Sequence, residues 1–121
     1  MEVDPRTRTG SMGEDAAMRV YAEAGYQIIS RNWRCRIGEL DLVLARGATL
    51  VFCEVKARRS ETFGGGWESV TARKQAKVRA VAQAFLLSTG IKADAIRFDV
   101  ASVAVGRGPG NVTVELFPDA F

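Results

Sequence analysis

Two acidic residues and a lysine lie in two short apolar segments of the sequence. Asp41 belongs to Gly-Glu-Leu-Asp-Leu-Val-Leu-Ala, and twelve residues separate it from Glu54 in Leu-Val-Phe-Cys-Glu-Val-Lys, which ends at Lys56. Carboxylate oxygens without thiolate or imidazole ligands are typical of a Mg²⁺ or Mn²⁺ site rather than a zinc site. A lysine beside the metal could accept a proton from bound water if its pKa is lowered, or stabilise charge on phosphorus. The three residues therefore indicate metal-dependent hydrolysis.

The composition excludes several other chemistries. The sequence contains no histidine, which excludes imidazole bases, Ser-His or Cys-His nucleophiles and His-ligated metals. Cys35 and Cys53 fit neither a disulfide framework nor a zinc site, so we expect both to be reduced. No apolar run is long enough to span a membrane, and the first residues lack the apolar centre of a signal peptide. We expect a cytoplasmic protein without a membrane partner.

The two apolar segments predict neighbouring strands joined by a loop at residues 46–49. In such a hairpin Ala45 pairs with Leu50, and counting outward pairs Asp41 with Glu54. Directly opposed residues share a face of the sheet, with Cβ atoms roughly 5 Å apart. Two carboxylates at that distance destabilise a sheet unless a cation lies between them. The predicted strand pairing therefore supports the metal site.

A third acidic residue, Glu14, lies in the first predicted helix. Ser11-Met-Gly-Glu14 has the spacing of a capping box, so we expect the helix to begin at Ser11 and to end at Gly25. A capping role, in which the Glu14 side chain accepts a hydrogen bond from the Ser11 backbone amide, is sufficient to explain a glutamate at this position. Its spacing from Ala17, Met18 and Tyr21 nevertheless directs it toward the core, from where it could reach a metal held on the sheet.

The remaining pattern predicts one α/β domain with a mixed five-stranded sheet flanked by helices. It spans residues 11–121, after a disordered lead at 1–10. A Gly-rich segment at 60–68 is expected to close on substrate. Trp33 could belong to the core or stack on a base, and we expect the core. Besides the two central strands, the pattern predicts strands at Tyr26–Trp33, Ala95–Val103 and Asn111–Phe117 and a second helix from Thr71 to Thr89, ended by Gly90.

Basic residues bracket the carboxylates along the chain. A polyanion could approach the acidic site through such residues, although a solvated basic face explains each cluster equally well. A phosphate at the start of the second helix would offset the unfavourable cations there. The candidates for nucleic-acid binding are Arg34, Arg36, Arg58, Arg59, Arg73, Lys74 and Lys77.

These motifs together resemble the YraN family of small bacterial proteins. The resemblance covers residues 13–103, through Gly13-Glu14-x-x-Ala17, Asn32-Trp33-Arg34, Gly38-Glu39-Leu40-Asp41-Leu42, Val51-Phe52-x-Glu54-Val55-Lys56-x-Arg58 and Lys74-Gln75-x-Lys77. That family is similar to Holliday junction resolvases, in the restriction-endonuclease-like superfamily with the PD-(D/E)xK signature. Leu40 stands where the signature has proline, which removes no ligand.

The resemblance implies a restriction-endonuclease-like three-layer fold and a homodimer acting on DNA, with branched DNA as a candidate substrate. It implies Glu14, Asp41 and Glu54 as ligands of Mg²⁺ or Mn²⁺, Lys56 as the residue that activates or orients water, and Gln75 as an auxiliary catalytic residue. Two alternatives stay open. One is a catalytically silent nucleic-acid-binding module of the same fold, and the other is a structural ion cluster in a protein-interaction domain.

Overall fold

The fold consists of one β-sheet between two helices. The computed structural model describes residues 5–59, 70–108 and 110–121. These residues form two helices and five strands: α1 (Pro5–Glu23), β1 (Gln27–Cys35), β2 (Gly38–Arg46), β3 (Thr49–Arg59), α2 (Ala72–Thr89), β4 (Ala95–Val105) and β5 (Val112–Phe117). The strands follow one another across the sheet in chain order. Strands β3 and β4 run parallel and the other neighbours antiparallel, so the predicted mixed sheet is confirmed.

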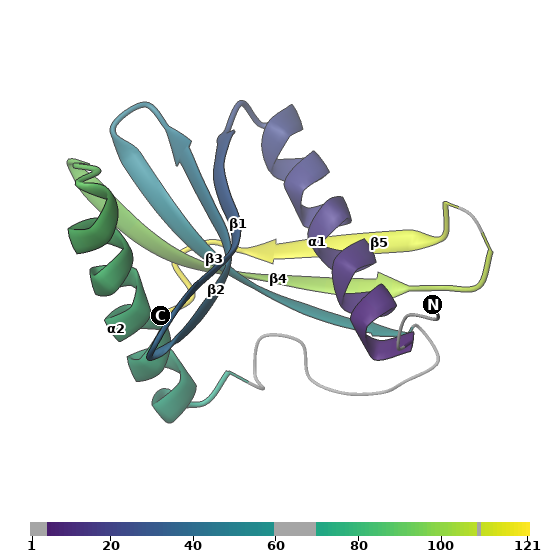
Figure 1. Cartoon of the computed structure of the whole chain (residues 1–121). Helices are drawn as coiled ribbons and strands as arrows, with labels where there is room; N and C mark the ends of the chain where they lie inside the picture. Colours follow the sequence, from purple (N-terminus) through teal and green to yellow (C-terminus); the bar gives the residue numbers. More distant parts are fainter. Residues whose placement is uncertain (1–4, 60–69, 109) are drawn as a thin grey trace.

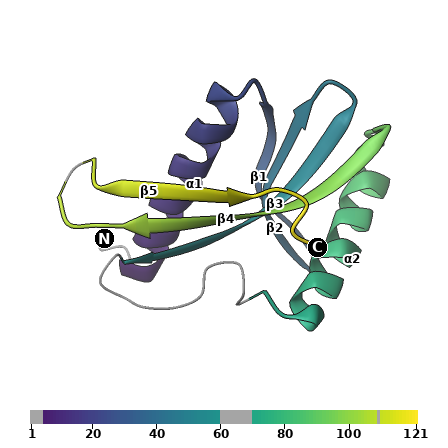
Figure 2. The same ribbon diagram turned by 180° about the vertical axis from the view of Figure 1, so that it is seen from behind.

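The two helices cover opposite faces of the sheet (Figure 1). On the α2 face, Leu40, Phe52 and Phe85 belong to one core cluster. On the α1 face, Tyr21 and Leu42 belong to another. Helix α2 carries the chain from β3 to the parallel strand β4, and β5 forms the far edge of the sheet beyond β4 (Figure 2). These three layers are those expected of a restriction-endonuclease-like core.

Helix α1 begins earlier than predicted. It starts at Pro5, a residue favoured in the first turn of a helix, so the expected disordered lead is helical from Pro5 onward. Residues 1–4 lie outside the described residues. The predicted capping box is wrong, because Ser11 lies inside the helix and its carbonyl and hydroxyl oxygens accept hydrogen bonds from Arg31. The end of the helix before Gly25, which has a φ of 90°, is confirmed.

Both predicted ends of α2 are confirmed. The Thr71 hydroxyl caps the helix by accepting a hydrogen bond from the Lys74 amide at 3.1 Å. Gly90 adopts a left-handed conformation, and its amide donates to the Leu86 carbonyl at 2.9 Å. The Gly-rich segment before α2, residues 60–68, lies outside the described residues.

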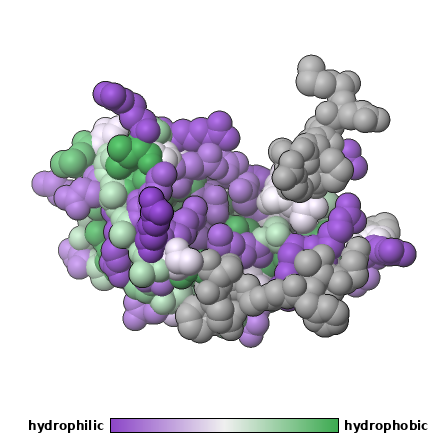
Figure 3. All heavy atoms as spheres, turned by 90° about the horizontal axis from the view of Figure 1, so that it is seen from below, coloured by the Kyte–Doolittle hydropathy of each residue, from purple (hydrophilic) through white to green (hydrophobic). Residues whose placement is uncertain are grey.

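Other predictions about core residues also hold. Trp33 packs edge-on against Phe85, with ring centroids 5.3 Å apart, so it is a core residue. Cys35 and Cys53 are both free thiols. In the described part of the chain, neither helix has the length and apolarity to cross a membrane. The two helices begin at the same end of the molecule, which is lowermost in Figure 1. Seen from below, its described surface is mostly hydrophilic (Figure 3).

Candidate functional site

The hairpin of β2 and β3 has the predicted register, but its paired residues end before Asp41 and Glu54. Ala45 pairs with Leu50, and the last pair joins Leu42 to Cys53. Asp41 therefore does not pair directly with Glu54 as predicted. Instead, Asp41 Oδ2 accepts a hydrogen bond from the Val55 backbone amide at 2.8 Å. The Asp41 carboxylate thus lies between the two strands at the point where they separate.

A 280 Å³ pocket brings Asp41 and Glu54 together between the sheet and α2. Glu54 is 3% exposed, and the Nζ atom of Lys74 lies 3.5 Å from its Oε1. Gly38 allows the helix to approach closely, because a Cβ atom there would lie 2.9 Å from Val81 Cγ2. The pocket is lined by Gly38, Glu39, Asp41, Glu54, Lys74, Lys77, Val78 and Val81.

The surroundings of both carboxylates disfavour negative charge. The pKa of Glu54 is raised to about 7, first by burial and then by the charge of Asp41, against the opposing effect of Lys74. Burial also raises the pKa of Asp41, partly offset by the hydrogen bond from Val55, and the charge of Glu14 raises it further. A cation with a preference for oxygen ligands would relieve this repulsion. The donor chemistry of Asp41 and Glu54 therefore fits Mg²⁺ or Mn²⁺.

Lys56 accompanies this pair on β3. Side chains two residues apart on a strand point to the same face, so Lys56 lies on the α2 face with Glu54. Its side chain is half-buried, and its positive charge lowers the pKa of Glu54. The predicted association of the lysine with the acidic pair is consistent with this position.

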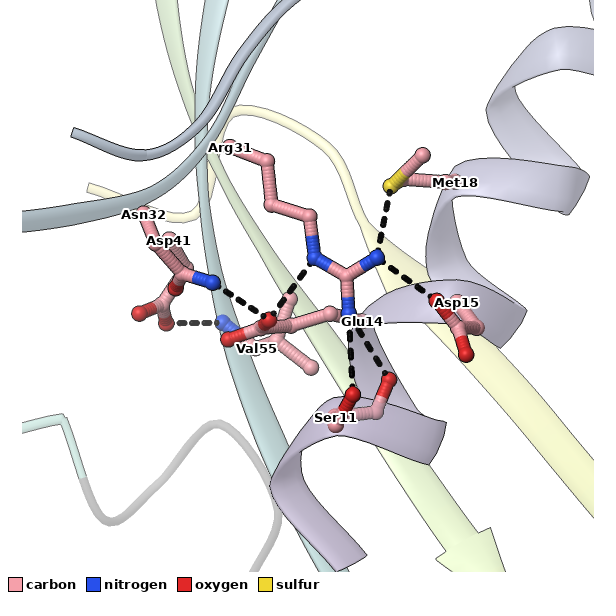
Figure 4. A network of polar contacts seen from close by, with 8 residues as sticks. All are labelled: Ser11, Glu14, Asp15, Met18, Arg31, Asn32, Asp41 and Val55. Carbon is pink, nitrogen blue, oxygen red and sulfur yellow. Dashed lines mark hydrogen bonds and ion pairs between the residues drawn. The ribbon is translucent and has the colours of Figure 1, made fainter. Parts of the chain in front are cut away.

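The Glu14 carboxylate is held by hydrogen bonds from two residues of β1. Its Oε1 atom accepts hydrogen bonds from Arg31 Nε and from Asn32 Nδ2, each at 3.1 Å. Figure 4 shows Asn32 and Asp41 next to the Glu14 carboxylate, in agreement with the effect of Glu14 on the Asp41 pKa. Among the residues that the structure describes, no group of three or more Cys, Asp or Glu side chains is arranged to hold a metal ion. Asp41 and Glu54 therefore share one pocket, and Glu14 lies next to Asp41 without lining that pocket.

The predicted auxiliary residue Gln75 does not line the pocket. Its Nε2 atom donates to the Val70 carbonyl at 3.1 Å, which ties α2 to the residue before it. Lys74, which was predicted to bind nucleic acid, also contacts Glu54. Its spacing of four residues from the buried Val78 is the signal that would have placed it on the sheet side of α2.

The other predicted nucleic-acid-binding residues differ in their exposure to solvent. Arg34 pairs with Glu39 at 2.6 Å on the surface. Arg58 is half-buried near the end of β3, whereas four basic side chains are exposed to solvent: Arg36, Arg59, Arg73 and Lys77. Arg73 and Lys77 lie within the first two turns of α2, so the structure brings two exposed cations to the pocket's helix.

Comparison with known proteins relates nearly the whole chain to one family. Residues 13–103 match the profile described as "Uncharacterised protein family UPF0102". A UPF0102 protein from Moorella thermoacetica is 43% identical, over 96% of this chain and 97% of the relative. UPF0102 protein FRAAL5785 from Frankia alni is 46% identical over the full length of both chains. The resemblance to the YraN family is thereby confirmed, and the chain belongs to the uncharacterised protein family UPF0102.

Proposed function

We propose that this protein is a metal-dependent endonuclease that hydrolyses phosphodiester bonds in DNA. The observation that carries the proposal is the pocket shared by two carboxylates, buried Glu54 and half-buried Asp41. Lys74 lines the same pocket, and Lys56 lies on the same strand as Glu54. Burying two like charges costs several kcal/mol without a compensating ion. A divalent cation supplied with the DNA substrate would offset that cost.

Asp41 and Glu54 are the residues that would hold the ion. Bound Mg²⁺ or Mn²⁺ would polarise the scissile phosphate and lower the pKa of a coordinated water. Lys56 shares the face of Glu54 and would stabilise charge on phosphorus or accept the proton of the water. The site would keep much of the bulk water out, because Glu54 is buried and Asp41 lies between two strands.

Exposed cations near the pocket give DNA a route to it. Arg73 and Lys77 lie on α2, and Arg36 lies in the turn between β1 and β2. Phosphate contacts of this kind are independent of base sequence and weaken as salt rises. The similarity to junction resolvases makes branched DNA the first substrate to test and a homodimer, with one site in each protomer, the first assembly to test.

A nuclease panel tests the proposal. Purified protein is incubated with four-way junction, flap and duplex DNA in Mg²⁺, Mn²⁺ or EDTA, beside Asp41→Ala and Glu54→Gln variants. We expect cleavage by the wild type only, dependent on the metal. Equal cleavage by the wild type and both variants would identify a contaminating nuclease and contradict the proposal.

A second candidate is a nucleic-acid-binding module without turnover. Two contacts favour it: Arg31 Nε lies 3.1 Å from Glu14 Oε1, and Lys74 Nζ lies 3.5 Å from Glu54 Oε1. These cations could satisfy the carboxylates without metal. Salt-sensitive mobility shifts of DNA, with no heat on Mn²⁺ titration and no cleavage, would support this candidate over the nuclease. Absence of both DNA and Mn²⁺ binding would leave a structural ion cluster.

A further inference from the structure

The alternation of side chains between the two faces of the sheet is interrupted in β1 at Asn32. Successive odd-numbered residues of a regular strand share a face, yet Arg31 contacts Glu14 of α1 whereas Trp33 packs on Phe85 of α2. Asn32, between them, has a φ of 54°. Non-glycine residues rarely adopt this left-handed conformation, and asparagine tolerates it better than most. The backbone of Asn32 therefore turns Arg31 toward one layer and Trp33 toward the other.

The alternation is also interrupted in the neighbouring strand β2, at Asp41. Arg31 pairs with Leu42 and Trp33 with Leu40, which places Asn32 across from Asp41. Leu40 belongs to the core cluster under α2, whereas Leu42 belongs to the cluster under α1. The two strands thus become irregular together, beside the proposed metal ligand. Strained backbone that the surrounding structure maintains often marks a functional site.

The guanidinium group of Arg31 is fixed in place by several hydrogen bonds. An arginine side chain has five N–H donors. Nε donates to Glu14, and the two terminal nitrogens contact Asp15, Met18 and two oxygen atoms of Ser11 (Figure 4). Arg31 therefore fastens β1 to α1, with Glu14 beside it. It is not available for a DNA phosphate.

We propose that Asn32 is a positioning residue, which together with Arg31 fixes the Glu14 carboxylate beside Asp41 as part of the metal site. This inference rests on the proposed function. Both hydrogen bonds from β1 go to Oε1 of Glu14. They restrain its rotation and keep a third carboxylate at hand for an ion held by Asp41 and Glu54. Residues that orient metal ligands in this way commonly change metal affinity 10–100-fold when replaced.

Calorimetric titration of Asn32→Gly with Mn²⁺ tests the inference. Glycine accepts the positive φ without steric cost, so this variant removes the amide and keeps the backbone. We expect the native circular dichroism spectrum and a Kd for Mn²⁺ raised about tenfold or more. The matched control is Asn111→Gly, which removes an amide that donates to the Arg107 carbonyl between β4 and β5. The control should keep the wild-type Kd.

A second variant separates the side chain from the backbone. Asn32→Ala loses the same amide but also disfavours the left-handed conformation, so we expect a lower melting temperature than for Asn32→Gly. A wild-type Kd in Asn32→Gly, or failure of that variant to fold, would overturn the inference. Weaker Mn²⁺ binding in Asn32→Gly, with a wild type that binds Mn²⁺ but cuts no DNA, would support the positioning role and reject the nuclease. A wild type without Mn²⁺ binding would overturn both.

Discussion

The carboxylate of Asp41 takes the place of a backbone partner for Val55. Its Oδ2 atom accepts the Val55 amide at 2.8 Å, just beyond the last paired residues of β2 and β3. The same carboxylate lines the pocket with Glu54. Asp41 thus has a structural role as well as the proposed role in metal binding, and the two roles are separable by substitution.

Asp41→Asn should separate these roles. The amide oxygen of asparagine can still accept the Val55 amide, but the variant lacks the charge that raises the pKa of Glu54. We expect the metal-free protein to be as stable as the wild type or more stable by about 1 kcal/mol, with Mn²⁺ binding lost. Asp41→Ala also loses the hydrogen bond and should be less stable than Asp41→Asn by about 1–3 kcal/mol. Urea unfolding and calorimetry measure both effects, and wild-type Mn²⁺ affinity in Asp41→Asn would contradict the metal site.

The raised pKa of Glu54 predicts a pH dependence of stability. With a folded-state pKa of about 7 against an ordinary 4.5, the folded protein keeps a proton that the unfolded chain has released. The free energy of unfolding therefore falls by on the order of 3 kcal/mol as pH rises between these two values. Above the higher value, the ionisation of Glu54 causes no further change. Glu54→Gln, which cannot ionise, should match the wild type at low pH and exceed it at pH above 7.

Urea unfolding in EDTA, with wild type and Glu54→Gln side by side, measures this difference. EDTA keeps divalent ions from stabilising the charged carboxylate. A difference between the two proteins that does not change with pH would show that Glu54 is ionised throughout the range.

A second buried carboxylate, Asp99, is predicted to serve the fold and not the site. It is fully buried and accepts hydrogen bonds from Tyr21 at 2.7 Å, from Arg97 at 2.8 and 2.9 Å and from the Asp119 amide at 2.9 Å. Burial raises the pKa of Tyr21 above its ordinary value, so its hydroxyl stays a donor. Tyr21→Phe should lower the free energy of unfolding by about 1–3 kcal/mol, with Mn²⁺ affinity unchanged. A changed affinity would link the two carboxylate networks.

The parts of the site that local patterns specify were predictable from the sequence. Alternation within the hairpin placed Asp41 near Glu54 and put Lys56 on the same face as Glu54, and the ends of α2 followed from Thr71 and Gly90. Local spacing gave the wrong role to Ser11, because its partner Arg31 lies on another element. The positive φ of Asn32 was equally unpredictable from alternation, which assumes a regular strand. Contacts between different secondary-structure elements determine both the role of Ser11 and the backbone conformation of Asn32.

Helix α1 packs so closely on β3 at Gly13 that a larger residue there should destabilise the protein. Gly10, in the same helix, provides the control. A Cβ atom on Gly13 would lie 2.5 Å from the Cβ of Ala57, whereas one on Gly10 would meet nothing within 4 Å. Alanine is favoured over glycine inside a helix, so Gly10→Ala should raise stability by about 0.5–1 kcal/mol. Gly13→Ala should instead lower it by about 1–3 kcal/mol, because the helix must move away from the strand.

The movement forced by Gly13→Ala should also reach the proposed site. Glu14 is the next residue, and its hydrogen bonds to Arg31 and Asn32 depend on the distance between α1 and β1. We therefore expect weaker Mn²⁺ binding in Gly13→Ala and wild-type binding in Gly10→Ala, measured by calorimetry on both variants. Loss of stability in Gly13→Ala with wild-type Mn²⁺ affinity would mean that metal binding does not require Glu14 in its present position. The ion would then depend on Asp41 and Glu54 alone.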